Sequence, residues 1–335
     1  MKKILCIILA FCLLTSLLTA CTPGGSGATT TTTEAGANPD NTKIRIGVLS
    51  GPTAMGALKL WSDNDPRYEF TLYSSPDLIL PDIVAGKLDI AALPTNNAAA
   101  FYNSNGKDTR VIALNTLGVL YLLDATGTVQ SLADLEGKTV YVPNAGSNPE
   151  YILRHILNEN GINATVETSI IQPTAIQQGL LAGTIEIAVL PQPAATATVI
   201  NAKTNKNKTI ASFDLSAEWN KIEDTPIAQG CLLASADFLA EHPAAVEAFL
   251  ENYAASVAYM TNAENLEAAA NLVVAKEILP KAPIAQQALP KCAITYVDGA
   301  EMKETLAAFY QILYSYAPQS IGGAIPDNGF YYGAE

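Results

Sequence analysis

Basic residues and histidine are scarce in this chain, and each shortage excludes a class of partner or site. The 335 residues include 19 lysines and arginines against 32 acidic residues, a net charge of −13, so a nucleic-acid partner is not expected. The two histidines, His155 and His242, form no cluster with cysteines or acids at metal-ligand spacing. We therefore expect neither a metal site nor another cofactor.

Cysteine is equally scarce once the N-terminal segment is set aside. Three of the five cysteines precede residue 22, which leaves Cys231 and Cys292 for the folded part of the chain. Both lie in apolar, strand-like runs, so two buried free thiols are favoured over a disulfide bond between them. A disulfide stays open as the alternative, because an oxidising compartment would permit one.

Long hydrophobic runs are absent apart from one at the N-terminus. Two lysines precede an apolar run over residues 4–18, and Leu-Thr-Ala-Cys closes it at Cys21. The run is shorter than the roughly 20 residues of a membrane span, and a small residue precedes the cysteine. This pattern predicts a lipoprotein signal peptide over residues 1–20, cleaved to leave Cys21 as the lipidated first residue. An uncleaved N-terminal anchor is the alternative.

The segment after the signal is predicted to be a flexible tether. Residues 21–42 are rich in Thr, Gly, Ala and Pro and cannot bury enough apolar surface to fold. Cleavage would leave 17 basic residues against 32 acidic ones, a net charge of −15. We expect the mature protein to be lipid-anchored on the extracytoplasmic face of the cell membrane, with its folded part starting near Lys43.

The chain does contain a repeat, whose two copies lie 97 residues apart, at residues 76–94 and 173–191. Each copy has an apolar helix-like run, then Ala-Gly, one acidic residue, and a short apolar strand that ends at proline. This is the α-to-β half of a crossover unit. The sequence therefore predicts an α/β fold with two similar lobes and a ligand cleft between the carboxyl ends of their sheets.

The order of the predicted elements divides the chain between the lobes. In front of each repeat copy we expect a strand, a loop and a helix. A break at Asn115 is interpreted as the first crossing between lobes, and the apolar run over residues 227–234 as the return. We therefore expect lobe one over residues 43–116 and 229–335, and lobe two over residues 117–228.

Four loops at the strand ends should converge on the cleft, two of them before helices and two after the repeat strands. Free amides at a helix N-terminus favour an anionic or strongly accepting group, and Asn and Gln offer both donors and acceptors. Each of these residues would also fit as a simple helix cap or turn residue. The candidate ligand-binding residues are Ser50, Gly51, Pro52, Thr53, Asn96, Asn97, Thr116, Gly146, Ser147, Asn148, Gln192 and Trp219.

Two features of this set bear on the ligand. Trp219 could stack on a planar ligand or anchor a core. No arginine or lysine lies in the four loops, so the bidentate clamp usual for carboxylates is missing, which favours a neutral or heterocyclic ligand. Arg154 is the basic residue that could reach the cleft from a helix.

Three motifs together resemble substrate-binding lipoproteins of ABC importers. They are the lipobox, the doubled Ala-Gly-x-[Leu/Ile]-[Asp/Glu]-Ile-Ala-x-Leu-Pro, and the stretch over residues 134–139 before a Gly-Ser loop. The similarity is to the nitrate/sulfonate/taurine branch, whose members include relatives that bind thiamine-precursor pyrimidines. Residues 237–250 also resemble the family's post-hinge helix pair, so the resemblance covers residues 43–316.

The resemblance implies a type 2 periplasmic-binding-protein fold, α/β and two-lobed, with the ligand held in the cleft between the lobes. It further implies a non-enzymatic protein, expected to be a monomer, that delivers its ligand to an ABC permease and its ATPase. The ligand would be a small molecule of the sulfonate, nitrate-like, or pyrimidine and thiamine-precursor class.

Two other functions stay open on the sequence. Menaquinone-pathway enzymes that act on chorismate-derived metabolites have the same fold and similar motifs. They act in the cytoplasm, whereas this chain has a lipoprotein signal and no acid–base or nucleophile set in its cleft loops. The third reading is a surface-anchored sensor that passes its ligand to a receptor.

Overall fold

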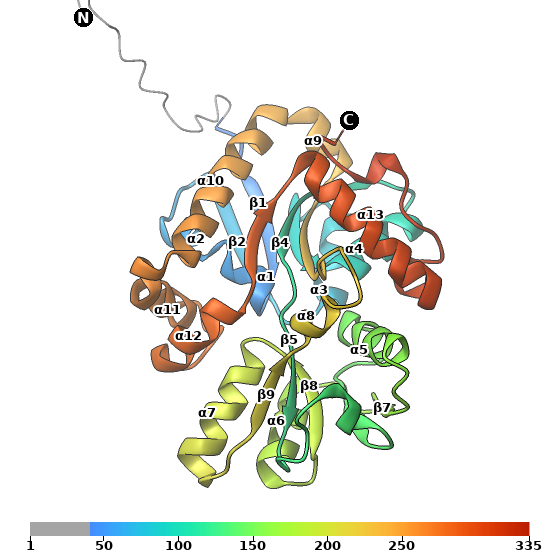
Figure 1. The fold of residues 1–335 in the computed structure, drawn as a ribbon. Coiled ribbons are helices and arrows are strands. Elements are labelled where there is room, and N and C mark those ends of the chain that lie inside the picture. The colour runs from blue at the N-terminus through green and yellow to red at the C-terminus, as the bar shows by residue number, and fades with distance from the viewer. Residues whose placement is uncertain (1–40, 335) are drawn as a thin grey trace, which may run out of the picture. The chain divides into compact units, whose positions relative to one another are not determined.

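The computed structural model describes residues 41–334, which form two sheets with helices packed around them (Figure 1). The expected signal peptide, the lipidation site Cys21 and nearly all of the tether lie outside the described residues. Within the described part, no helix combines the length and apolar character that crossing a bilayer requires.

The larger sheet has six strands. They are β1 (Ile44–Leu49), β2 (Tyr68–Tyr73), β3 (Ile90–Pro94), β4 (Thr109–Thr116), β10 (Gly230–Ser235) and β11 (Ile294–Val297). Their order is β11-β4-β10-β3-β1-β2. β1 is parallel to β2 and β3, whereas β10 is antiparallel to β3 and β4, and β11 is antiparallel to β4. Residues 90–93 of β3 are all buried, as expected of a central strand covered on both faces.

The smaller sheet has five strands. They are β5 (Leu120–Asp124), β6 (Thr139–Tyr141), β7 (Thr165–Glu167), β8 (Ile187–Pro191) and β9 (Ala211–Asp214). Their order is β7-β6-β8-β5-β9, with β6 parallel to β7 and β8, and β5 antiparallel to β8 and β9. We call the part built on the larger sheet lobe one, and the part built on the smaller sheet lobe two.

Helices cover both sheets. The α-helices are α1 (Pro52–Met55), α2 (Leu58–Ser62), α3 (Pro76–Val84), α4 (Thr95–Ser104), α5 (Asn148–Glu159), α6 (Pro173–Ala182), α7 (Ala194–Lys206), α8 (Leu215–Trp219), α9 (Ala236–Glu241), α10 (Pro243–Thr261), α11 (Leu266–Ala275), α12 (Ala282–Ala288) and α13 (Gly299–Tyr316). Short 3-10 turns are η1 (Leu132–Leu135), η2 (Ala263–Asn265), η3 (Leu289–Lys291), η4 (Pro318–Ile321) and η5 (Asn328–Phe330).

Both copies of the sequence repeat fold as a helix followed by the central strand of a sheet. α3 leads into β3, and α6 leads into β8. In each copy one proline begins the helix, where a missing amide hydrogen costs nothing, and another ends the strand. The strands around them also correspond, since β4-β10-β3-β1-β2 in one sheet matches β9-β5-β8-β6-β7 in the other. The predicted two-lobed α/β fold is confirmed.

The chain passes between the lobes twice, at residues 117–119 and 220–229. The strand break expected at Asn115 is wrong, because this residue lies inside β4, where its amide donates to the Thr53 and Cys231 carbonyl oxygens (3.3 and 3.4 Å). β4 ends at Thr116, the residue at which the first segment of lobe one was expected to end. The chain leaves the strand beside Gly118. A Cβ atom at Gly118 would lie 2.1 Å from the Ser216 hydroxyl oxygen, so glycine lets residues 117–119 pass close to α8.

Successive side chains of β3 pack alternately into two hydrophobic clusters, one on each face of the larger sheet. Ala91 and Leu93 of β3 join the cluster that includes Phe309 of α13, whereas Ile90 and Ala92 join the cluster that includes Phe249 of α10. This period of two is that of a strand buried on both faces. Figure 1 accordingly shows α10 and α13 on different sides of this sheet.

The two cysteines of the folded part are buried and free. Cys231 lies in β10 and packs in the same cluster as α13, while Cys292 packs with α11 and α12. The interpretation of both as buried thiols is therefore confirmed.

Candidate functional site

Two adjoining cavities lie where the strand ends of the two lobes meet, with volumes of about 320 and 210 Å³. Lobe one contributes residues at the carboxyl ends of β1, β2 and β3, and lobe two contributes residues after β6, at the start of α6 and at the end of β8. Nine residues line both cavities, namely Leu49, Ser75, Pro76, Asp77, Pro94, Asn144, Ser147, Pro149 and Gln229. We therefore treat the cavities as two parts of one cleft, at the edge where open α/β sheets bind ligands.

Nine of the twelve residues that the sequence proposed for the ligand site line this cleft. The larger cavity is lined by Ser50, Pro52, Thr53, Thr116 and Ser147, and the smaller one by Asn96, Asn97, Gly146, Ser147 and Asn148. Segments that are up to 98 residues apart in the chain are thus brought together. Whether they bind a ligand stays a proposal.

The other three residues do not line either cavity. Gly51 caps α1 with a φ of 124°, a conformation that favours glycine. Gln192 is buried, and its side-chain oxygen accepts a hydrogen bond from the Thr196 amide at 3.3 Å. Each residue therefore serves the local backbone.

Trp219 lies in the hydrophobic core rather than at the cleft. Its indole nitrogen donates to the Thr225 carbonyl oxygen at 2.7 Å, and its ring packs against His155 and Phe309. Only 1% of the residue is exposed, so stacking on a cleft ligand is not available to it.

The sequence prediction missed the loop over residues 74–77 and the return residue Gln229. The loop was missed because the sequence analysis did not predict β2. Without that strand, nothing placed residues 74–77 at the carboxyl end of a sheet strand. A signal was present, since each repeat copy begins with a proline that starts a helix. These helices, α3 and α6, both begin at the cleft, because each follows the carboxyl end of a parallel edge strand, β2 or β7.

Four helices of nine or more residues begin at the larger cavity. They are α3, α4, α5 and α6, and their N-cap residues Ser75, Pro94, Ser147 and Gln172 all line it. Only the Ser75 hydroxyl group caps its own helix, by accepting from the Asp77 amide at 3.2 Å. The converging amide groups and helix dipoles favour an acceptor or a negative group of a ligand.

Three buried amide side chains surround the smaller cavity, each with an oxygen atom that has no hydrogen-bond partner. They belong to Asn96, Asn148 and Gln229, whose exposed fractions are 4%, 1% and 9%. Buried polar atoms are nearly always paired in native proteins, and an unpaired one costs roughly 1–3 kcal/mol. The described residues thus leave three buried acceptor atoms unsatisfied in the side chains around the smaller cavity.

The cleft carries little charge. Asp77 is the one ionisable side chain among the described residues that line it, and Asp77 is exposed. Arg154, the basic residue that the sequence analysis considered for the cleft, donates to the Glu150 carboxylate at 2.8 Å. The other oxygen of this carboxylate accepts from the Gly146 amide at 2.7 Å, so the pair holds the loop before α5. Elsewhere in residues 41–334 no group of three His, Cys, Asp or Glu residues could hold a metal ion.

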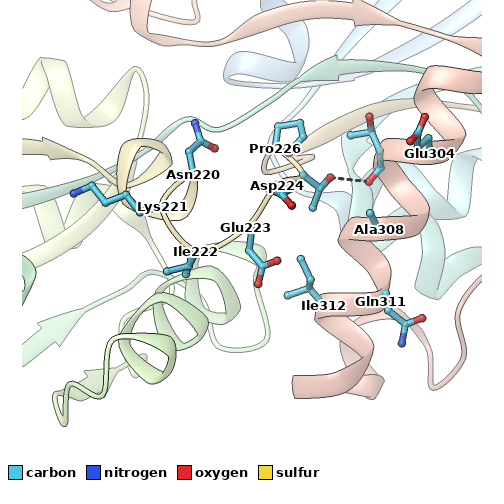
Figure 2. A pocket seen from close by; sticks show the side chains of 12 residues that line it. Asn220, Lys221, Ile222, Glu223, Asp224, Pro226, Glu304, Ala308, Gln311 and Ile312 are labelled. Carbon is cyan, nitrogen blue, oxygen red and sulfur yellow. Dashed lines mark hydrogen bonds between the residues drawn. The ribbon is translucent and has the colours of Figure 1, made fainter.

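A second hollow, of about 620 Å³, lies between the crossing segment 220–226 and α13 (Figure 2). Acidic side chains dominate it, with Glu223, Asp224 and Glu304 against Lys221. Glu223 is already paired with His155 at 2.7 Å. None of the buried unpaired polar atoms of the described residues belongs to its lining, in contrast to the cleft.

Comparison with known proteins gives one family and one fold. The family model described as NMT1/THI5 like matches residues 86–265, which is more than half of the chain. A search of curated proteins found no match.

Solved structures match over most of the chain. An ABC transporter protein from Parabacteroides distasonis is 24% identical, with a TM-score of 0.74 over 87% of this chain and 98% of that one. The periplasmic aliphatic sulphonate-binding protein of Escherichia coli is 15% identical, with a TM-score of 0.70 over 88% and 92%. The alkanesulfonate-binding protein of Xanthomonas axonopodis pv. citri, bound to MOPS, is 12% identical, with a TM-score of 0.60 over 87% and 96%. At these identities the likeness shows the fold, which is the type 2 periplasmic-binding-protein fold.

Proposed function

This chain belongs to the NMT1/THI5-like family, and from that premise we propose that it is the solute-binding component of an ABC importer. It would capture a small polar molecule between its lobes and deliver it to a membrane permease driven by an ATPase. One observation carries the proposal: four helix N-termini and three unpaired buried amides converge on a cleft between the lobes. Solved structures of similar fold include binding proteins of ABC importers, which supports the same function.

The lining of the cleft suggests a ligand with a polar head and an apolar body. Seven prolines line the larger cavity together with Leu49, Val119 and Ile171, so its walls are largely apolar. The amides of the smaller cavity would hold the polar head. A negative head would rely on helix N-termini alone, because no lysine or arginine among residues 41–334 lines either cavity. Sulfonates and pyrimidine or thiamine precursors have both parts, whereas a nitrate-like ion would leave the apolar walls unused.

The proposed location and state follow from the N-terminal sequence. Lipidation at Cys21 would hold the protein on the extracytoplasmic face of the membrane, and residues 22–42 would let the folded part reach a permease. We propose a monomer, since a cleft formed by two lobes of one chain needs no second copy.

The composition of the cleft favours binding over catalysis. General acid–base chemistry needs two groups that exchange protons with a substrate, and nucleophilic catalysis needs an activated side chain. The described residues that line the cleft include no histidine, cysteine or lysine, and Asp77 is their single carboxylate. A solute that enters this cleft would therefore be released without a chemical change.

A thermal-shift screen tests the proposal. The mature chain, with Cys21→Ser to keep it soluble, is heated with sulfonates, nitrate, and pyrimidine and thiamine precursors. A ligand present at 100 times its Kd adds roughly 2.7 kcal/mol to the free energy of unfolding, which raises Tm by several degrees. The proposal requires that the compound be recovered unchanged. Conversion of the compound would favour an enzyme. An unchanged Tm with every class of compound would contradict the proposed ligand classes.

A further inference from the structure

Thr95 lies directly beneath the cleft without lining it. The residue is fully buried at the start of α4, between Pro94 and Asn96 of the lining. It was not among the residues that the sequence singled out. Its position makes it a contact point for segments that do line the cleft.

Four hydrogen bonds meet at this residue. Its hydroxyl group donates to the Ala228 carbonyl oxygen at 2.5 Å and accepts from the Asn148 side-chain nitrogen at 3.3 Å. Its amide donates to the Gln229 carbonyl oxygen at 3.2 Å, and its carbonyl oxygen accepts from the Tyr310 hydroxyl group at 2.9 Å. Thr95 thus joins α13, the return crossing and the first residue of α5.

The bond to Asn148 crosses from lobe one to lobe two. A hydroxyl group has one proton, and the Ala228 carbonyl oxygen can only accept, so the proton points there. The hydroxyl lone pairs therefore face Asn148 and can only be approached by its NH₂ group. This assigns the amide, since its nitrogen lies toward Thr95 and its other polar atom, Oδ1, is buried without a partner.

Thr95 bonds to the side chain of one of the three unpaired amides of the smaller cavity. The Asn148 side chain donates to the Thr95 hydroxyl group, whereas Gln229 accepts from the Thr95 amide through its backbone carbonyl oxygen, and Asn96 is the next residue in the chain. We propose that Thr95 is a positioning residue of the cleft, which couples the two lobes and sets the direction of the Asn148 amide. The coupling rests on the proposed function only in taking the cleft as the ligand site.

Hydrogen–deuterium exchange of the mature chain tests the coupling without a ligand. Thr95→Val keeps the shape but removes both hydroxyl bonds. The amides of residues 150–153, across the cleft in α5, should then exchange about fivefold faster, the effect of one hydrogen bond of ordinary strength. Thr95→Ser restores the hydroxyl group and should restore the wild-type exchange rates.

Thr198→Val is the matched control. Thr198 is equally buried in lobe two, and its hydroxyl group donates to the Ala194 carbonyl oxygen at 2.8 Å within α7. This change should accelerate exchange in its own helix and leave residues 150–153 unchanged. A general loss of stability in the Thr95→Val protein would instead accelerate exchange throughout the chain.

Exchange rates at residues 150–153 within twofold of wild type in Thr95→Val would overturn the proposal. Should that variant not fold, Asn148→Ala removes the same bond from the other lobe. It should accelerate exchange of the Thr95 amide, and an unchanged rate there would overturn the proposal equally. Because no ligand is used, a failed ligand screen leaves this result intact, and a failed exchange test leaves the proposed function intact.

Discussion

In the first copy of the repeat the acidic residue Asp89 is buried, whereas in the second copy Glu186 at the same register is exposed. The Asp89 carboxylate accepts from the Arg45 backbone amide at 2.7 Å and from the Arg45 guanidinium group at 3.0 and 2.5 Å. The two copies therefore share a backbone path, whereas the acidic side chain at this position anchors lobe one only.

The residue that follows each repeat strand makes the same kind of backbone hydrogen bond in both lobes. Thr95 and Gln192 occupy the same register, and the amide of each donates to a crossing segment, at Gln229 O (3.2 Å) and Val119 O (2.8 Å). Each repeat strand is therefore tied to one of the two connections between the lobes. The side chains differ again, since one reaches across to Asn148 and the other bonds within its own turn.

The largest expected effect on stability is at the acidic residue of each repeat copy. Asp89→Ala should lower the free energy of unfolding by about 2–3 kcal/mol, because it leaves a buried amide and part of the Arg45 side chain without their charged acceptor. Glu186→Ala should change it by less than about 0.5 kcal/mol, as a surface substitution does. Urea unfolding of both variants measures the difference. Equal losses would show that the two copies are anchored alike.

The repeat helices should also differ in their tolerance of a methyl group. Gly179 of α6 packs on Ile185, where a new Cβ atom would lie 2.6 Å from the Ile185 Cδ1 atom, while the same register in α3 holds Asp82. Gly179→Ala should therefore destabilise the protein by about 1–2 kcal/mol through overpacking, despite the better helix propensity of alanine. The double variant with Ile185→Val should recover part of this loss. If Gly179→Ala alone stabilises the protein, the helix is less tightly packed than described.

Ligand affinity should depend on the lobe-one amide that has no counterpart in the second copy. Asn97 lines the smaller cavity, and Ala194 holds its register in lobe two. Asn97→Ala should weaken binding of the compound found in the screen about fivefold, with little change in Tm, and Ser147→Ala should act similarly. Titration calorimetry measures both. Asn205→Ala, an exposed amide of α7, is the control, and equal affinity in all variants would remove these residues from the site.

The smallest expected effect is the pH dependence of one ion pair in lobe one. Lys107 and the Tyr102 hydroxyl group donate to the Asp327 carboxylate and lower its pKa to about 2 from 3.8. The register of Tyr102 holds Val199 in the second copy, which lacks this tie.

A depressed pKa stabilises the fold above the unfolded value of 3.8, and this contribution is lost as the pH falls through about 2. Because the Asp327 side chain is 52% exposed, the contribution should stay below about 1 kcal/mol. The difference in urea midpoint between Asp327→Asn and wild type should shrink as the pH falls from 7 to 2. A difference that is constant with pH would mean that the pair does not stabilise the fold.

The sequence predicted the fold because the repeat combines a helix period, a strand period and proline stops in both copies. It did not predict β2, whose residues 68–73 alternate in exposure and include charged Glu69, nor that β4 runs on through Asn115. The loops that line the cleft could be predicted, because they follow the carboxyl ends of predicted strands, and these ends lie at one edge of each sheet. Thr95 and Gln229 could not be found in this way, because their bonds join segments 53 or more residues apart in the chain.

The place of β10 in the larger sheet has a consequence for how the protein is made. This strand lies between β3 and β4, yet the ribosome adds it only after the whole of lobe two. Lobe two is a continuous stretch and can pair its strands as soon as it has emerged, whereas β3 and β4 lack the strand that joins them until residue 230 arrives. Because distant pairings form slowly, we expect lobe two to fold first and lobe one to close around the late strand.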